Sequence, residues 1–238
     1  MSEPTAGTVS GAQRALAWSI HGLTASGAIF ALVALLAATE GAFSLASLLM
    51  LAALAIDSVD GTLARAARVE ERAPRIDGRR LDDIVDYLNY VIVPAVFMVS
   101  AGNLSHWAWA ALPVAASAYG FSQTSAKTDD HFFLGFPSYW NVIAIYLWLF
   151  DIPPAASAAI VSGFAALVFV PFKYVYPSRL AVLYRTTIVL AALWMAGMAI
   201  AVLHPERAAS GPWVELSLVF PAYYLALSAR LGGLHRAG

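Results

Sequence analysis

The 238-residue sequence contains no cysteine. A disulfide framework, a thiolate nucleophile and a zinc site built from cysteine are therefore excluded. Charge is also scarce, because Asp, Glu, Lys and Arg make up 12% of the chain, against roughly 25% in an ordinary globular protein. A formal net charge of -1 gives no overall basic surface, which argues against nucleic acid as a partner.

Hydrophobic residues are abundant instead: they make up 60% of the chain and gather in stretches of about twenty. This pattern excludes a soluble enzyme and a disordered chain. It predicts an all-α protein, a polytopic bundle of about eight transmembrane helices that forms one domain over residues 1–238. The expected spans are Leu16–Ala38, Ala42–Ala64, Asp83–Ala101, Ser105–Ala126, Tyr139–Phe150, Pro153–Phe172, Leu183–Leu203 and Trp213–Leu231. The fifth is short for a hydrocarbon layer of about 30 Å.

The loop charges indicate how these spans are oriented. With the N-terminus inside, thirteen of the 14 Lys and Arg residues lie on the cytoplasmic side and only Arg207 lies outside. An odd number of spans would spread these charges over both faces. The sequence therefore predicts a multi-pass protein of the cytoplasmic (inner) membrane with both termini in the cytoplasm. The small residues of the spans favour close helix packing without giving a dimer motif, so a homodimer stays open.

Acidic residues cluster at the cytoplasmic ends of two predicted spans. Within each cluster the spacing places carboxylates and very small side chains on one helix face, at about 100° per residue. The first face carries Asp57, Asp60, Gly61 and Ala64, and the second carries Gly78, Asp82 and Asp86. Two neighbouring helices would thus bring four carboxylates together.

Like charges at a membrane boundary repel each other unless a cation lies between them. Carboxylate oxygens suit a hard divalent ion such as Mg²⁺ or Mn²⁺, and four of them could hold two ions. The small residues leave the backbone open to a nucleotide or diphosphate, and Arg65 offers bidentate recognition of phosphate. The alternative is that these acids simply pair with the arginines between Arg65 and Arg80.

The complete pattern, D-x-x-D-G-x-x-A-R from Asp57 and G-x-x-x-D-x-x-x-D from Gly78, resembles the signature of the CDP-alcohol phosphotransferase family. Twelve residues separate Arg65 from Gly78. This long spacer is similar to the one in the bacterial phosphatidylcholine synthase branch of that family, which also resembles this chain in length and in its eight expected spans. The run from Lys127 to Asn141 looks like theirs as well.

The resemblance implies an enzyme that joins choline to the phosphatidyl group of CDP-diacylglycerol and releases CMP. It implies that Asp57, Asp60 and Asp82 bind a pair of metal ions, and that Asp86 is both a metal contact and the general base. The residues that it implies for CDP-diacylglycerol binding are Asp60, Gly61, Ala64, Arg65, Gly78 and Asp82. The chemistry agrees, because bound metal neutralises a diphosphate while a carboxylate takes the proton of the attacking hydroxyl.

A choline site should use aromatic faces, since a quaternary ammonium group has no hydrogen-bond donor. The cytoplasmic run before the fifth span supplies candidates, namely Asp129, Phe136, Tyr139 and Trp140. These aromatic residues could equally form an interfacial belt. A second aromatic cluster, residues 172–176, carries Lys173 and suits lipid phosphate better than a cation.

Two rival functions stay open. Another family member could use serine, glycerol 3-phosphate or an inositol phosphate, although a phosphorylated acceptor needs an additional basic pocket. A divalent-cation transporter would also carry intramembrane acids, but near the bilayer centre and not at one end of the spans.

Overall fold

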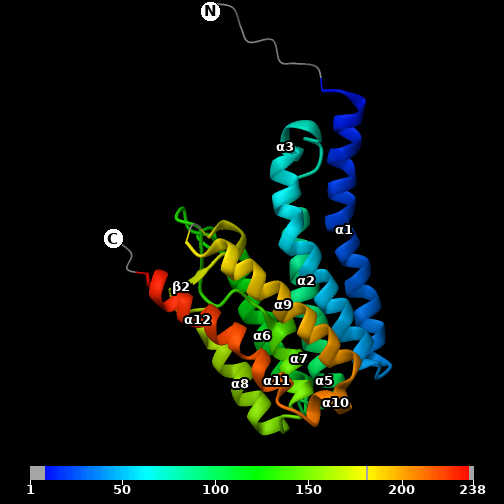
Figure 1. Cartoon of the computed structure of the whole chain (residues 1–238), viewed down its shortest axis with the longest axis vertical. Coiled ribbons are helices and arrows are strands. Elements are labelled where there is room, and N and C mark those ends of the chain that lie inside the picture. Colours follow the sequence, from blue (N-terminus) through cyan, green and yellow to red (C-terminus); the bar gives the residue numbers. More distant parts are fainter. Residues whose placement is uncertain (1–8, 181, 236–238) are drawn as a thin grey trace, which may run out of the picture.

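Helices make up most of the computed structural model, which describes residues 9–180 and 182–235. The first two, α1 (Gly11–Thr39) and α2 (Phe43–Ala66), form the most extensively packed pair of elements. They are joined by a tight turn in which Gly41 adopts the left-handed backbone that glycine tolerates, with φ of +78°. In Figure 1 this pair extends beyond most of the other helices toward the N-terminal end.

Local sequence explains where α1 begins. The Gln13 amide donates to the Ser10 hydroxyl, and the Ser10 amide donates to the Gln13 side-chain oxygen. This reciprocal capping box satisfies two backbone donors that would otherwise lack partners. The cap extends the helix five residues before the predicted start of the first span at Leu16.

The third span is continuous but irregular. It runs through α4 (Gly78–Tyr87), a π-helical turn η1 (Leu88–Ile92) and α5 (Val93–Ser100). Asp77 caps its start by accepting a hydrogen bond from the Arg80 amide, so Asp77 points away from the predicted acidic face. The basic segment between α2 and α4 contains one short helix, α3 (Val69–Arg72).

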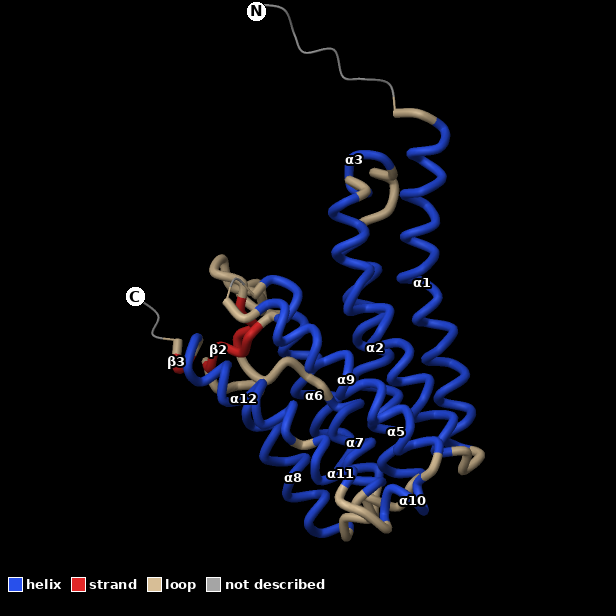
Figure 2. Tube along the Cα trace, in the orientation of Figure 1, coloured by secondary structure: helices blue, strands red, loops and turns tan. Residues whose placement is uncertain are grey.

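The remaining helices lie beside one half of the α1–α2 pair (Figures 1 and 2). They are α6 (Trp107–Ser122), α7 (Trp140–Leu149), α8 (Pro154–Leu167), α9 (Tyr184–Leu203), α10 (Pro205–Ala209), α11 (Trp213–Ser217) and α12 (Val219–Leu231), with a 3-10 turn η2 (Pro177–Arg179). The core that these helices share with α2 and α5 includes the fully buried side chains of Trp140, Phe97 and Met50.

A small antiparallel sheet departs from the all-α expectation. Its strands are β1 (Phe132–Leu134), β2 (Phe172–Val175) and β3 (Gly233–Leu234), in that order across the sheet. Phe133 pairs with Tyr174, and Lys173 pairs with Gly233. The predicted sixth span was wrong in extending to Phe172, because α8 ends at Leu167 and Pro171 cannot continue a helix.

The long helices confirm a polytopic membrane bundle. Within the described residues, five helical segments are long and apolar enough to cross a membrane: Gly11–Thr39, Phe43–Ala66, Gly78–Ser100, Tyr184–Leu203 and Trp213–Leu231. The helices α7 and α8 are apolar but shorter, and the 10 residues of α7 reach only about 15 Å at ~1.5 Å per residue. Large apolar side chains such as Ile29 and Leu193 are exposed on the long helices, as contact with lipid requires.

Candidate active site

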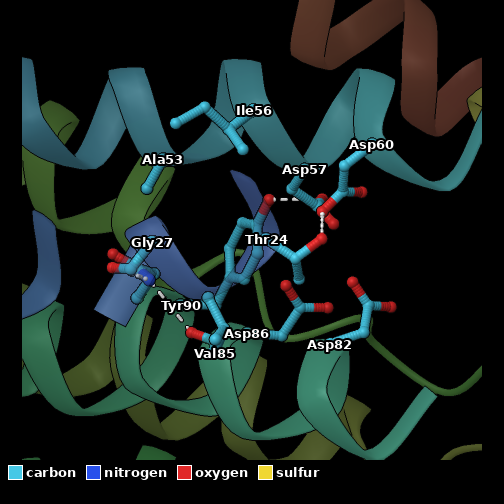
Figure 3. Close-up of a pocket in the computed structure, with 11 residues that line it drawn as sticks. Thr24, Gly27, Ala53, Ile56, Asp57, Asp60, Asp82, Val85, Asp86 and Tyr90 are labelled. Atoms are coloured by element: carbon cyan, nitrogen blue, oxygen red, sulfur yellow. Dashed lines mark hydrogen bonds between the residues drawn. The ribbon is translucent and has the colours of Figure 1, made fainter. Parts of the chain in front are cut away.

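The four predicted acids face one another across the gap between α2 and α4 (Figure 3). Asp57 and Asp60 come from α2, and Asp82 and Asp86 come from α4. Carboxylate oxygens of Asp57, Asp82 and Asp86 all lie within 4.8 Å of one another. The predicted juxtaposition of two acidic helix faces is therefore present in the structure.

A pocket encloses these acids. Its lining comes from three stretches of chain, α1, α2 and the α4–η1 segment. The lining residues are Thr24, Gly27, Ala53, Ile56, Asp57, Asp60, Asp82, Val85, Asp86, Asn89 and Tyr90. A side chain on Gly27 would place its Cβ 2.5 Å from Val85 Cγ1, so α1 can approach α4 this closely only because residue 27 is glycine.

Two hydroxyl groups hold the carboxylates of α2. The Tyr90 hydroxyl donates to Asp57 Oδ2 at 2.7 Å, and the Thr24 hydroxyl donates to Asp60 Oδ2 at 2.7 Å. Asp60 is buried, with 4% of its surface exposed. The hydrogen bonds from α1 and η1 thus orient the two acids of α2 toward those of α4.

The acids do not pair with the basic residues of the neighbouring loop. In residues 9–180 and 182–235, the ion pairs are Arg68–Glu71, Arg80–Asp77 and Lys173–Asp130. None of them involves the four acids of the pocket. Charge neutralisation by the nearby arginines therefore does not account for the cluster in the described structure.

The donor set fits a divalent metal. Three carboxylates converge from two helices, their oxygens are hard donors, and none of them forms an ion pair with a basic side chain of the described residues. Such a set suits Mg²⁺ or Mn²⁺. Asp60 lies next to the three and could extend the site.

The predicted nucleotide-binding residues lie at the same end of the helices. Gly61, Ala64 and Arg65 follow Asp60 along α2, and the Arg65 side chain is exposed apart from a 2.9 Å hydrogen bond that it donates to the Thr62 hydroxyl. Gly78 opens α4 directly against α1, where an added Cβ would lie 3.2 Å from the His21 ring. Gly61, Ala64 and Gly78 are each partly exposed, so these small residues leave part of the backbone beside the acids accessible.

The four predicted choline-site residues do not form one cluster. The partly buried Tyr139 ring lies edge-on to Tyr90, with centroids 6.1 Å apart, which places it beside the acid pocket. Trp140 is fully buried and donates its indole hydrogen to the Ser117 hydroxyl at 2.8 Å. Phe136 packs against Trp140 in the core, whereas Asp129 is exposed in the loop before β1.

Most of the second aromatic cluster, residues 172–175, forms strand β2 of the small sheet. The Lys173 ammonium donates to Asp130 Oδ2 at 2.7 Å and lies 5.7 Å from the centre of the Phe132 ring. The hydrogen bond from Lys173 lowers the pKa of the Asp130 carboxyl. Lys173 therefore ties β2 to the loop before β1 and does not contact the acid pocket.

Sequence reasoning missed Thr24, Tyr90 and Tyr224. Tyr90 had a detectable signal, because it continues the four-residue spacing of Asp82 and Asp86. Thr24 had none, since it lies 36 residues before its partner Asp60. Tyr224, whose ring centre is 5.9 Å from that of Tyr139, comes from the last helix and is equally remote in sequence.

Comparison with known proteins shows to which family this chain belongs. The profile described as CDP-alcohol phosphatidyltransferase matches residues 21–172, a stretch that contains the whole acid pocket. The chain belongs to the CDP-alcohol phosphatidyltransferase family.

Three similar proteins carry the same name. The chain is 40% identical over 225 residues to a phosphatidylcholine synthase of Legionella pneumophila, with 89% of this chain and 87% of that protein covered. It is 34% identical over 223 residues to a phosphatidylcholine synthase of Pseudomonas aeruginosa, with 91% and 94% covered. A phosphatidylcholine synthase of Rhizobium meliloti is 32% identical over 213 residues, with 88% and 87% covered.

Proposed function

We propose that this protein transfers the phosphatidyl group of CDP-diacylglycerol to choline and releases CMP, as a phosphatidylcholine synthase. The observation that carries the proposal is the convergence of Asp57, Asp82 and Asp86 within 4.8 Å, inside the family motif of a chain that resembles such synthases over most of its length. A metal-assisted transfer that passes through no covalent enzyme intermediate needs such a carboxylate cluster and no nucleophilic side chain.

Metal binding is assigned to the acids of the pocket. Asp57, Asp60, Asp82 and Asp86 would hold Mg²⁺ or Mn²⁺, with two ions as the working assignment. Bound metal would supply neutralisation of the diphosphate and stabilisation of CMP as it leaves.

Asp86 is assigned as the general base. Its carboxylate takes the proton of the choline hydroxyl as the choline oxygen attacks the phosphorus of the phosphatidyl group. The bond between that phosphorus and the bridging diphosphate oxygen breaks, and the electron pair leaves with CMP. Asp86 suits this role because it lies in the acid cluster on the α4 side, next to η1 and Tyr90.

The nucleotide-lipid is assigned to the exposed end of α2 and the start of α4. Arg65 would contact the diphosphate through its planar guanidinium group. Asp60 and Asp82 would contribute from within the pocket, and Gly61, Ala64 and Gly78 would let the cytidine diphosphate lie against the helix backbone.

For choline we assign the Tyr139 ring as the cation-binding face, because it lies beside the Asp57 partner Tyr90. Trp140, next to Tyr139 in sequence, and Phe136, which packs against Trp140, would fix the start of α7 in the core, and Asp129 would contribute charge from the loop. An aromatic face attracts a quaternary ammonium by about 0.5–2 kcal/mol.

The membrane arrangement is proposed from the loop charges. Eight spans in a single domain over residues 1–238 would place both termini and the acid pocket on the cytoplasmic side of the inner membrane. Of the residues in this charge count, Arg236 lies outside the described part of the chain. A homodimer would leave the assignment unchanged, because α1, α2, α4 and η1 of one chain line the pocket.

One assay tests the proposal against its rivals. Purified protein in lipid nanodiscs is given CDP-diacylglycerol, Mn²⁺ and one acceptor at a time, and CMP release and lipid product are measured. Choline should support release, whereas serine, glycerol 3-phosphate and an inositol phosphate should not. Release with one of those three alone would overturn the choline assignment, and Mn²⁺ flux into proteoliposomes without any CMP release would favour a transporter.

A further inference from the structure

Tyr90 contacts Asp57, one of the three carboxylates that lie within 4.8 Å of one another, without carrying charge itself. Its hydroxyl donates to Asp57 Oδ2 at 2.7 Å, and its side chain is buried, with 5% of its surface exposed. Figure 3 shows the Tyr90 ring standing between the two helices, with its hydroxyl directed at Asp57. One carboxylate oxygen of Asp57 is thus held by Tyr90, which leaves the other available to the cluster.

The π-helical turn explains why Tyr90 faces Asp57. In an α-helix each step of four residues overshoots a full turn of 3.6 residues, so a face that contains Asp82 and Asp86 drifts sideways by residue 90. A π-helix, with hydrogen bonds from residue i to i+5, has more residues per turn and opposes this drift. The turn over Leu88–Ile92 therefore keeps Tyr90 on the acidic face.

The sequence supplies a cause for this turn. Pro94 lacks an amide hydrogen, and in a regular α-helix its ring would clash with the carbonyl of the residue four positions earlier, which is Tyr90. A wider turn just before Pro94 relieves that clash. The neighbouring Asn89 then donates its side-chain amide to the Gly27 carbonyl at 2.9 Å, which fixes the turn against α1.

We infer that Tyr90 is a positioning residue for the metal site, which acts by orienting the Asp57 carboxylate for its ion. The inference rests on the proposed metal site. A hydrogen bond from a neutral donor fixes the rotamer of a carboxylate without competing for the cation. Loss of such a partner to a ligand typically weakens metal affinity or activity by roughly 10- to 100-fold.

The test measures Mn²⁺ binding itself, by electron paramagnetic resonance of the free ion, with purified protein in nanodiscs and no substrate. Tyr90→Phe removes one oxygen and keeps the ring. We expect it to weaken Mn²⁺ binding about 10-fold and to lower kcat for CMP release at subsaturating Mn²⁺, with partial recovery at high Mn²⁺. In an Asp57→Asn background the same substitution should have no further effect, because Tyr90 acts through Asp57.

Tyr87→Phe is the matched control. It lies three residues earlier, and its hydroxyl donates to the Val114 carbonyl on α6 at 2.9 Å, away from the acids. It should lower the thermal unfolding midpoint to a similar extent but leave Mn²⁺ affinity unchanged. If Tyr90→Phe does not yield monodisperse protein, Tyr90→Met, which also lacks the hydroxyl, must show the same weakening.

The outcomes distinguish the proposed metal site from the positioning role of Tyr90. Failure of the unmodified protein to bind Mn²⁺ would reject the proposed metal site. Tight binding by the unmodified protein, with equal affinity in the Tyr90 variants, would overturn the positioning role alone. Equal weakening in Tyr87→Phe and Tyr90→Phe would also overturn it, since the effect would then reflect general packing.

Discussion

The metal side and the acceptor side of the pocket are built from different kinds of structure. The acids stand on long helices, α2 and α4, whose backbone hydrogen bonds fix the spacing of every side chain. Most of the choline candidates stand on an irregular segment that includes β1 and the left-handed residues His131 and Ser138 and ends where Trp140 opens α7. Regular helix holds a ligand set in fixed geometry, whereas irregular backbone can change from one relative to another without disturbing that set.

This comparison predicts that loss of metal has the largest effect. Removing divalent ions with excess EDTA should abolish CMP release, because the carboxylates of Asp57, Asp82 and Asp86 would repel one another and the diphosphate charge would be unmet. Added Mn²⁺ or Mg²⁺ should restore activity. Undiminished turnover by metal-stripped protein would overturn the assignment of a metal site to the acids of α2 and α4.

The second-largest effect should follow from loss of the general base, Asp86. Asp86→Asn should lower kcat by at least about 10²-fold, the usual scale for loss of a general base, while CDP-diacylglycerol still binds. Asp83→Asn is the control, because Asp83 lies on the same helix but does not line the pocket. Similar losses in both variants would show that the effect is one of helix stability.

On the acceptor side, substitutions at Trp140 and Tyr139 should affect different properties: stability for Trp140 and choline affinity for Tyr139. Trp140→Ala removes a fully buried ring and its hydrogen bond to Ser117, so we expect the free energy of unfolding to fall by about 3–5 kcal/mol. Urea or thermal unfolding in mild detergent measures this loss. Full stability together with a selective choline defect would instead make Trp140 part of the choline site.

The smallest expected effect is on choline affinity. Tyr139→Leu keeps an apolar side chain but removes the aromatic face, so KM for choline should rise roughly two- to thirtyfold. KM for CDP-diacylglycerol should stay within about twofold, and stability should change less than in Trp140→Ala. An unchanged choline KM would move the cation site away from Tyr139.

The sequence alone determined the class of protein and the acidic half of the pocket. Composition and the length of apolar runs are local properties, and they were enough to predict a polytopic membrane bundle. Helical periodicity then placed Asp57 and Asp60 on one face and Asp82 and Asp86 on another, because positions on a single helix follow from spacing alone.

Only the tertiary structure decided which groups support those acids and which aromatic residues reach them. Thr24 meets Asp60 across 36 positions and Tyr90 meets Asp57 across 33, so both contacts depend on how whole helices pack. Tyr139 and Trp140 are adjacent in sequence, yet one lies beside the pocket and the other is buried in the core. The small sheet likewise joins segments more than 100 residues apart, from Phe132 to Leu234, which no local pattern encodes.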